Sequence, residues 1–322
     1  MRKKQKKTFI LVEFTLAIFV VILALVMMWE RNGEEREKIA VVVQNPDDIE
    51  WSAFKYGLEK AAEDWKVDVS VVSTGTMRGI GQEKHIIEQE EKKGVDGVIF
   101  QPVAGGNIKA MLKKIRIPVV MIEHVCAPGE GEELPPIVGP DQQKMGKTLA
   151  EEVLRDYAGN LEGKEIGLFS KTTDSPVVMA REQGVRAVLE QEGAKVRWFV
   201  SGDFEETPNE LLDGQSQVDI ILALDDTSLV RWGGYATETS SEVPVYGIGH
   251  STEAVYYLDK DVVKCLVVPD EFNMGYQSVS EMVEKIRHSN GKSQNQNVSY
   301  KVIRRDTLFS KENQESLFTM SQ

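Results

Sequence analysis

From residue 38 onward, hydrophobic and polar positions follow two periods that alternate along the chain. Short runs of consecutive aliphatic and β-branched residues recur, and residues 39–43 form the first of them. Such a run is typical of a strand buried on both faces of a sheet. Between the runs, apolar residues stand three or four positions apart, as at Phe54, Leu58 and Ala61, which places them on one face of a helix.

The same two periods continue along the chain as far as about residue 287. They predict strands at 68–73, 97–100, 118–122, 165–169, 195–200, 220–224, 245–248 and 263–268. They predict helices at 82–93, 107–114, 176–191, 207–212 and 273–287, and others that begin near Asp141, Asp226 and Ser251. Strands separated by helices indicate an α/β protein with parallel sheets and right-handed crossovers. A proline-rich stretch at 135–140 separates two such units, and the polar tail after Leu308 is expected to fray.

The N-terminal segment has a different pattern. Residues 9–28 are apolar apart from Glu13, and a basic run at 2–7 precedes them. At about 1.5 Å per residue, such a segment spans roughly 30 Å, the thickness of a bilayer core. We therefore expect a basic cytoplasmic tail at 1–8, a transmembrane anchor at 9–29 and a linker at 30–37. The protein would be a single-pass plasma-membrane protein whose main domain lies on the extracytoplasmic face.

A cleaved secretory signal is the alternative interpretation of this segment. A signal peptidase needs small residues at the cleavage positions, and residues 26–33 contain no A-x-A pattern. A lipoprotein would carry a cysteine just after the apolar run, but the first cysteine is Cys126. An uncleaved anchor fits the sequence better.

Composition narrows the functions of the external part. The formal net charge is −13, and the five basic residues of the N-terminal tail leave −18 for the remainder. This charge opposes binding to nucleic acid. About 285 residues are enough for two lobes, each with its own core. With only Cys126 and Cys265, no metal-binding cysteine pattern exists. We expect two free thiols, although a disulfide between them stays open.

The usual signatures of enzyme chemistry are missing from the sequence. The first predicted strand leads into residues 44–48, which contain no glycine, so no dinucleotide-binding loop is present. No phosphate-binding loop and no nucleophile elbow occurs elsewhere. His124 and His250 follow predicted strands but have no adjacent nucleophile in a recognisable pattern. We therefore expect no catalytic site, no metal and no cofactor.

Eight short segments carry a resemblance to a known family. They are the first predicted strand with its helix ending at 55–57, then 94–99, 117–120, 139–146, 180–184, 224–226, 245–249 and 274–275. In their order and spacing the chain resembles the ribose/galactose-type periplasmic sugar-binding proteins over residues 38–305. That family shares its type I fold with the ligand domain of lactose-repressor-like regulators. A membrane segment rather than a helix-turn-helix precedes the domain, which argues against a DNA-binding repressor.

The resemblance implies two doubly wound parallel-sheet lobes joined by three crossovers. It places these crossovers near 139–140, 269–270 and 300–301. The N-terminal lobe would comprise 38–139 with 270–300, the C-terminal lobe 140–269 with 301–310, and a tail 311–322. A ligand would lie between the lobes and the hinge would close around it.

The resemblance also implies roles for single residues. It places aromatic walls at Trp51 and Phe204, and a ligand-binding guanidinium at Arg181, whose forked donors suit a ring oxygen and a neighbouring hydroxyl. Trp51 also leads the apolar stripe of its helix, so a core role stays open. For Arg181 the other interpretation is a surface ion pair with Glu182 or Glu205.

Carboxylates follow two of the predicted strands. Glu123 and Asp225 fall where related sugar binders have Asp and Asn in contact with ligand. Asp226 is expected to cap the next helix rather than to touch ligand.

The sequence departs from the family pattern at several positions. Gly249, followed by His250, stands in place of an Asp, and Pro269 in place of a Gln. Ahead of the first aromatic wall, Asp48 and Glu50 replace Asn and Phe. The predicted ligand-binding set is therefore Asp48, Glu50, Trp51, Glu123, Arg181, Phe204, Asp225 and His250.

Carboxylates outnumber basic groups in this set. Clustered carboxylates without partners are costly in a closed cleft. Either some of them point to solvent or the ligand brings positive charge. We rank a neutral sugar or polyol first and an amine-bearing ligand, such as an amino sugar, second.

The expected function follows from the anchor and the resemblance together. The chain would be a membrane-anchored extracytoplasmic solute-binding protein that captures a sugar or polyol between its lobes for an ABC importer. One alternative is a ligand-sensing subunit for a membrane sensor kinase or chemoreceptor. Another, prompted by Gly249 and Pro269, is a degenerate scaffold without ligand.

Overall fold

The computed structural model describes most of the chain in segments. These are residues 18–22, 36–44, 51–74, 79–102, 108–125, 134–172, 175–202, 213–288 and 295–317. The chain divides into two units, Met1–Glu37 and Lys38–Gln322. Several predictions fall outside the described residues: Asp48, Glu50, Cys126, Phe204, Glu205 and the helix at 207–212.

In the first unit, residues 18–22 are helical and the rest of the expected anchor lies outside the described residues. Among the helices that are described, none combines the length and the apolar character needed to span a bilayer.

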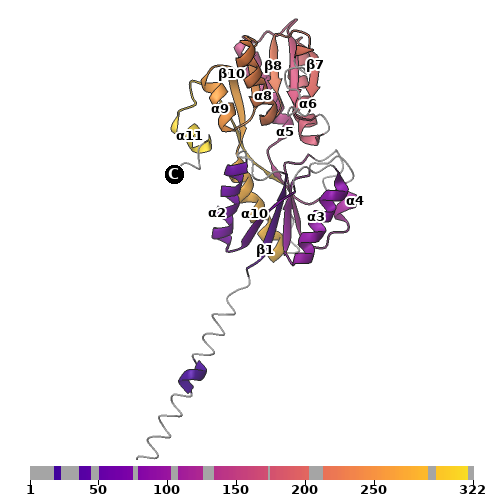
Figure 1. The fold of residues 1–322 in the computed structure, drawn as a ribbon, viewed down its shortest axis with the longest axis vertical. Coiled ribbons are helices and arrows are strands. Elements are labelled where there is room, and N and C mark those ends of the chain that lie inside the picture. The colour runs from indigo at the N-terminus through magenta and orange to yellow at the C-terminus, as the bar shows by residue number, and fades with distance from the viewer. Residues whose placement is uncertain are drawn as a thin grey trace, which may run out of the picture. The chain divides into compact units, whose positions relative to one another are not determined.

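The described part of the second unit forms two six-stranded sheets, one in each lobe (Figure 1). The first sheet has the order β11-β5-β4-β3-β1-β2, and all its strand pairs are parallel. Its strands are β1 (Lys38–Val43), β2 (Asp68–Ser73), β3 (Gly97–Phe100), β4 (Val119–Ile122), β5 (Ile137–Gly139) and β11 (Gln296–Asn297). Its helices are α2 (Ser52–Trp65), α3 (Ile80–Lys93), α4 (Ile108–Leu112) and α10 (Glu271–Arg287).

Strand alternation explains how these helices cover the sheet. Ile39 and Val41 of β1 pack with the apolar residues of α2 and α10. Ala40 and Val42 point to the opposite face and pack against α3 and α4. Figure 1 shows α2 with α10 on one side of the sheet and α3 with α4 on the other.

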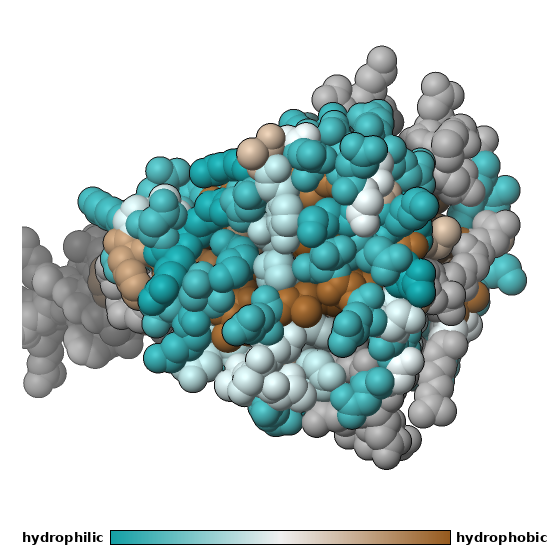
Figure 2. All heavy atoms as spheres, turned by 90° about the horizontal axis from the view of Figure 1, so that it is seen from above, coloured by the Kyte–Doolittle hydropathy of each residue, from teal (hydrophilic) through white to brown (hydrophobic). Residues whose placement is uncertain are grey.

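The second sheet has the order β12-β10-β9-β8-β6-β7. Its strands are β6 (Glu165–Ser170), β7 (Lys195–Ser201), β8 (Ile220–Ala223), β9 (Val245–Ile248), β10 (Val263–Pro269) and β12 (Tyr300–Ile303). Of these, β12 alone among the described strands runs antiparallel to its neighbour. Helices α5 (Gln142–Asp156) and α6 (Pro176–Gln191) pack on one face, and α8 (Asp226–Thr239) and α9 (Thr252–Asp259) on the other. Viewed from the end of this lobe, hydrophilic side chains dominate the surface and apolar ones show as a band between them (Figure 2).

The predicted α/β fold with two parallel-sheet lobes is confirmed. The described chain passes from one lobe to the other three times, between β5 and α5, between β10 and α10, and between β11 and β12. Two of these crossovers are hydrogen-bonded to each other. The backbone N–H of Asp270 donates to the Ser299 carbonyl oxygen at 3.0 Å, and the Ser299 hydroxyl donates to the Asp270 carboxylate at 3.2 Å.

Each lobe contains one pair of helices whose backbones touch. A Cβ atom on Gly57 or Gly275 would lie closer than 3.0 Å to a carbonyl oxygen of the facing helix in the α2–α10 pair. The same holds for Gly146 and Gly184 in the α5–α6 pair. These four glycines therefore permit an approach that any side chain would prevent.

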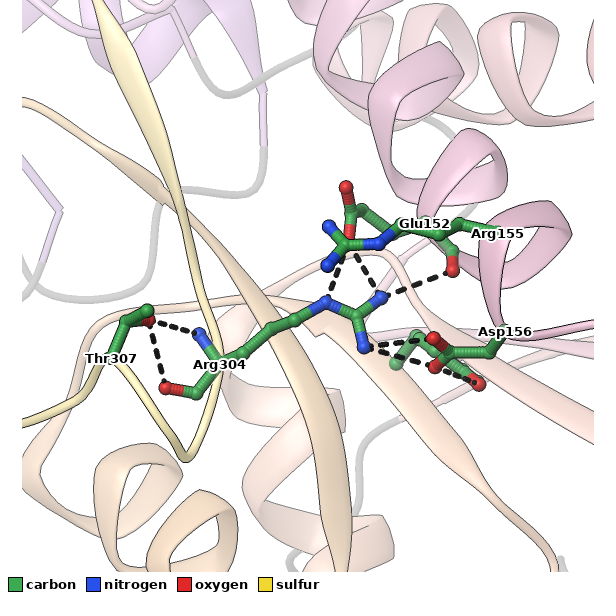
Figure 3. A network of polar contacts seen from close by, with 6 residues as sticks. Glu152, Arg155, Asp156, Arg304 and Thr307 are labelled. Carbon is green, nitrogen blue, oxygen red and sulfur yellow. Dashed lines mark hydrogen bonds and ion pairs between the residues drawn. The ribbon is translucent and has the colours of Figure 1, made fainter.

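A partly buried polar network fastens the end of β12 to α5 (Figure 3). Arg304 Nε donates to Glu152 Oε2 at 2.7 Å, and Nη1 donates to both oxygens of Asp156, at 2.9 and 3.0 Å. Tyr246 donates its hydroxyl to Asp156 as well, at 2.8 Å. Burial acts to lower the pKa of Arg304, but the hydrogen bonds to Asp156 and Glu152 raise it above its usual value.

Cys265 lies buried beside this network and forms no disulfide. Burial raises the pKa of the Cys265 thiol to about 12, and the nearby Glu152 adds to the shift. The thiol is therefore protonated and unreactive in the folded protein.

The expectation of a frayed tail after Leu308 is wrong for the residues that the structure describes, which extend to Leu317. Residues Lys311–Leu317 form helix α11. Leu308 is fully buried and Leu317 packs against the core of the second lobe. Asn313 is also buried and donates its side-chain amide to the Thr307 carbonyl oxygen at 2.8 Å. Two apolar anchors and one satisfied amide are enough to hold a helix whose composition is otherwise polar.

Replacing Gly275 with Ala should separate α2 from α10, because the new Cβ meets the Phe54 carbonyl oxygen. We expect the free energy of unfolding to fall by about 1–3 kcal/mol, as in other overpacked sites. Gly81→Ala in α3 is the matched control, since nothing lies within 4 Å of its Cβ. It should be neutral or stabilise by up to about 1 kcal/mol through helix propensity. Urea denaturation measures both, and equal effects of the two changes would contradict the close-packing explanation.

Candidate functional site

A cavity of about 140 Å³ lies between the two lobes, at the carboxyl ends of their strands. This is where open parallel sheets place their ligands. The first lobe and the second crossover line it with Trp51, Gln101, Glu123, Pro269 and Glu271. The second lobe lines it with Arg181, Asp225, Asp226, Ile248, Gly249 and His250. The structure thus brings together five predicted site residues: Trp51, Glu123, Arg181, Asp225 and His250.

Arg181 projects from α6 and is only 6 % exposed. Its Nε donates to Gln142 Oε1 at 2.7 Å and its Nη1 to the Leu224 carbonyl oxygen at 2.8 Å. Its Nη2 lies 3.9 Å from Glu123 Oε1, an ion pair that is too long for a hydrogen bond. The guanidinium is therefore held firmly by its own lobe and keeps Nη2 for a partner in the cavity.

Burial lowers the pKa of Arg181, while the charges of Glu123, Asp225 and Glu271 act against that shift. The alternative of a surface ion pair with Glu182 is wrong, since Arg181 is buried and Glu182 accepts from Arg186 at 2.7 Å.

Glu123 faces Arg181 from the other lobe. It follows β4 with φ of 48°, in the left-handed region. That conformation costs a non-glycine residue about 1–2 kcal/mol. Its Oε2 accepts from Gln101 Nε2 at 2.8 Å, which fixes the carboxylate at the cavity wall. Each lobe thus presents one charged group braced by a glutamine of the same lobe.

The structure assigns the helix cap to Asp225 and not to Asp226, and both residues line the cavity. Asp225 is the N-cap of α8 and accepts from the Ser228 backbone N–H at 2.8 Å. Its Oδ2 accepts from the Ser170 hydroxyl at 2.7 Å and from the Lys171 backbone N–H at 2.8 Å. The prediction that Asp226 caps this helix is therefore wrong. Both oxygens of Asp225 are occupied by the protein itself.

Asp226 instead reaches the loop after β9. Its Oδ1 accepts from the backbone N–H groups of His250 and Ser251, at 2.7 and 2.9 Å. A Cβ on Gly249 would lie 2.5 Å from the same oxygen. The carboxylate of Asp226 thus occupies the space that a side chain at position 249 would need.

Trp51 precedes the first residue of α2 and is 6 % exposed. Its ring packs edge-on against Phe54, with centroids 5.3 Å apart, and belongs to the core of the first lobe. The same residue lines the cavity. It is a core residue and part of the cavity wall at once.

A comparison with protein families identifies the domain. The model described as "Periplasmic binding protein domain" matches residues 39–292, most of the chain. The chain belongs to this family.

Solved structures show the same fold for this periplasmic binding protein domain. GanP, a glucose-galactose binding protein from Geobacillus stearothermophilus, superposes with a TM-score of 0.74 at 20 % identity, covering 85 % of this chain and 99 % of that one. A carbohydrate transporter solute-binding protein from Agrobacterium radiobacter, in complex with D-arabinose, gives 0.76 at 15 % identity, covering 88 % and 100 %. The XylFII-LytSN complex gives 0.72 at 16 % identity, covering 84 % and 98 %. At these identities the likeness concerns the fold. No curated protein sequence matches the chain.

Sequence reasoning did not find three polar groups of this binding domain. Gln101 directly follows β3 and Glu271 follows the end of β10, so a search of every strand end would have found both. Gln142 is 2 % exposed and acts through Arg181, and no sequence signal pointed to it. Within the described part of the domain, no group of three carboxylate, imidazole or thiol side chains is arranged to hold a metal ion.

Removing the Asp225 carboxylate should weaken the domain as well as the cavity. Asp225→Ala leaves the Ser228 and Lys171 N–H groups without their acceptor. We expect a loss of about 1–2 kcal/mol in the free energy of unfolding, the usual cost of a lost helix cap. Asp225→Asn keeps one acceptor oxygen and should lose less. Chemical denaturation measures both, and an Ala variant as stable as the native chain would show that the cap is dispensable.

Proposed function

We propose that this protein captures a sugar or polyol in the cavity between its lobes. The observation that carries the proposal is the pair of charged groups that face each other there. Arg181 Nη2 and Glu123 Oε1 come from different lobes and are not hydrogen-bonded to each other. A hydroxyl group donates and accepts at the same time, so sugar hydroxyls can satisfy both.

The size and the walls of the cavity favour a small polar ligand. Its volume of about 140 Å³ is below the roughly 300–1,000 Å³ of pockets for drug-sized molecules. Trp51 offers an apolar surface for a ring, and polar groups surround it. Fold relatives support a sugar: one is described as a glucose-galactose binding protein and another was solved with D-arabinose.

Binding would close the two lobes on each other. Glu123 and Arg181 belong to different lobes, so a ligand that contacts both favours the closed arrangement. The linked crossovers at Asp270 and Ser299 would form part of the hinge.

The site should be tested by thermal unfolding of the full-length chain in detergent, against a panel of sugars and polyols. A ligand at 100 times its Kd should stabilise the protein by about 2.7 kcal/mol. Arg181→Ala should abolish the shift, because no other cation among the described residues that line the cavity is permanently charged. Arg197→Ala is the matched control, since Arg197 is exposed in β7 and pairs with Glu165.

Two results would count against sugar capture. If no compound shifts the unfolding temperature, the ligand-free scaffold becomes the better description. If a hit survives Arg181→Ala, the ligand binds elsewhere. Circular dichroism of the unliganded variant shows whether it remains folded.

Residues 9–29 would hold the domain at the membrane, with the tail 1–8 in the cytoplasm and the cavity outside. The apolar length and the basic flank support this location. The full-length chain should stay in the membrane pellet after alkaline carbonate extraction, and a chain that starts at residue 36 should be soluble. N-terminal sequencing provides the second test. A mature chain that begins after the apolar segment would contradict the anchor, because the segment would then have been cleaved.

The captured ligand would be delivered to an ABC importer, and a receptor role is the second candidate. A carbohydrate transporter solute-binding protein among the fold relatives supports delivery. The fold relative XylFII was solved in complex with LytSN, and this complex supports a role in which the chain reports to a partner protein. Neighbouring genes for a permease and an ATPase would favour the first role, and a histidine kinase gene the second.

A further inference from the structure

We infer that the cavity selects a polyhydroxylated ligand that carries a protonated amine, that is, a ligand of the amino-sugar class. This inference rests on the proposed sugar capture and adds the charge of the ligand to it. Two independent features carry it: the hydrogen-bonding groups that the protein leaves unused in the cavity, and the sign of the charge around them.

The unused donor belongs to a buried guanidinium. Arg181 is more than nine-tenths buried, lines the cavity and engages Nε and Nη1 within its own lobe. Its Nη2 has only the 3.9 Å ion pair with Glu123. Water can reach this nitrogen in the open cavity, but a donor without a hydrogen bond becomes costly once the lobes close and water leaves. A ligand hydroxyl or ring oxygen near this nitrogen would satisfy it, which accounts for the polyhydroxylated part of the ligand.

Negative charge exceeds positive charge around the same space. Among the described residues that line the cavity, the carboxylates are Glu123, Asp225, Asp226 and Glu271, and the guanidinium is that of Arg181. His250 also lines it, and its protonation would add one cation. Carboxylates remain in excess in either state of the imidazole.

The hydrogen bonds that described residues donate to Glu123, Asp225 and Asp226 come from neutral groups. Asp225 accepts from two backbone N–H groups and a hydroxyl, and Asp226 accepts from two backbone N–H groups. Such bonds fix the orientation of a carboxylate but leave its charge in place. When the lobes close and water leaves, that charge still needs a cation.

Two carboxylates keep an oxygen for that cation. Asp226 uses only Oδ1 towards the described residues, so Oδ2 is available, and Glu123 Oε1 has no hydrogen bond there. Asp225 has both oxygens occupied. An ammonium group has three donors and no acceptor, so it matches carboxylate oxygens contributed by the two lobes. A neutral hydroxyl in its place would satisfy one oxygen and cancel no charge.

The experiment compares matched ligands by isothermal titration calorimetry of the full-length chain in detergent, at a pH where the amine is protonated. The probes are D-glucose, D-glucosamine and N-acetyl-D-glucosamine, with the corresponding galactose and mannose series. In at least one series the amine should bind about tenfold or more tightly than the neutral parent. The N-acetyl form should lose that advantage, because acetylation removes the charge.

Asp226→Asn tests the carboxylate directly. The asparagine keeps Oδ1 for the N–H groups of His250 and Ser251 and removes only the charge and the free carboxylate oxygen. It should reduce the preference for amine over parent sugar by about tenfold. Asp306→Asn, an exposed position in the same lobe, makes the same charge change away from the cavity and should retain the preference.

The outcomes separate the inference from the proposed function. Binding of neutral sugars that equals or exceeds binding of their amines overturns the inference and leaves sugar capture intact. A preference that survives Asp226→Asn also overturns the inference, since the amine is then recognised elsewhere. If no amino sugar binds, the inference is also overturned. If no compound of the sugar and polyol panel binds, the proposed function is overturned as well.

Discussion

The arrangement of the cavity depends on two places where helix backbones touch. Gly57 and Gly275 join α2 to α10, and Gly146 and Gly184 join α5 to α6. A Cβ on Gly146 would meet the carbonyl oxygen of Arg181 itself, so this contact fixes the backbone that carries the guanidinium. Helices α2, α5 and α10 also begin at the cavity or beside it. A substitution at a glycine remote from the ligand would thus shift the groups that recognise it.

Most of the fold could be predicted because buried parallel strands and amphipathic helices have distinct periods. The exceptions are elements whose stability comes from distant partners. The three residues of β5 read as a proline-rich connection, and only pairing with β4 and β11 makes them a strand. Helix α11 has a polar sequence, and Leu308 and Leu317 hold it by packing on the second lobe. Neither the strand pairing of β5 nor the packing of α11 can be recognised from the local amino-acid composition.

The position of the site followed from the rule that ligands bind at strand carboxyl ends, together with a family resemblance. The roles of the individual residues in the site could not be predicted in this way. Asp225 and Asp226 are adjacent and chemically identical, and their roles depend on which one meets Ser170 and which one meets His250. Those partners are 55 and 24 positions away. Gln142 likewise owes its importance to Arg181, 39 positions along the chain.

The close approach of Asp226 to Gly249 has a consequence for how this sequence can change. A side chain at position 249 would displace the Asp226 carboxylate, so a change at one position acts on the other. An aspartate at 249 would push the Asp226 carboxylate away from the His250 and Ser251 N–H groups, which would then lose their acceptor. The pair is therefore an epistatic unit.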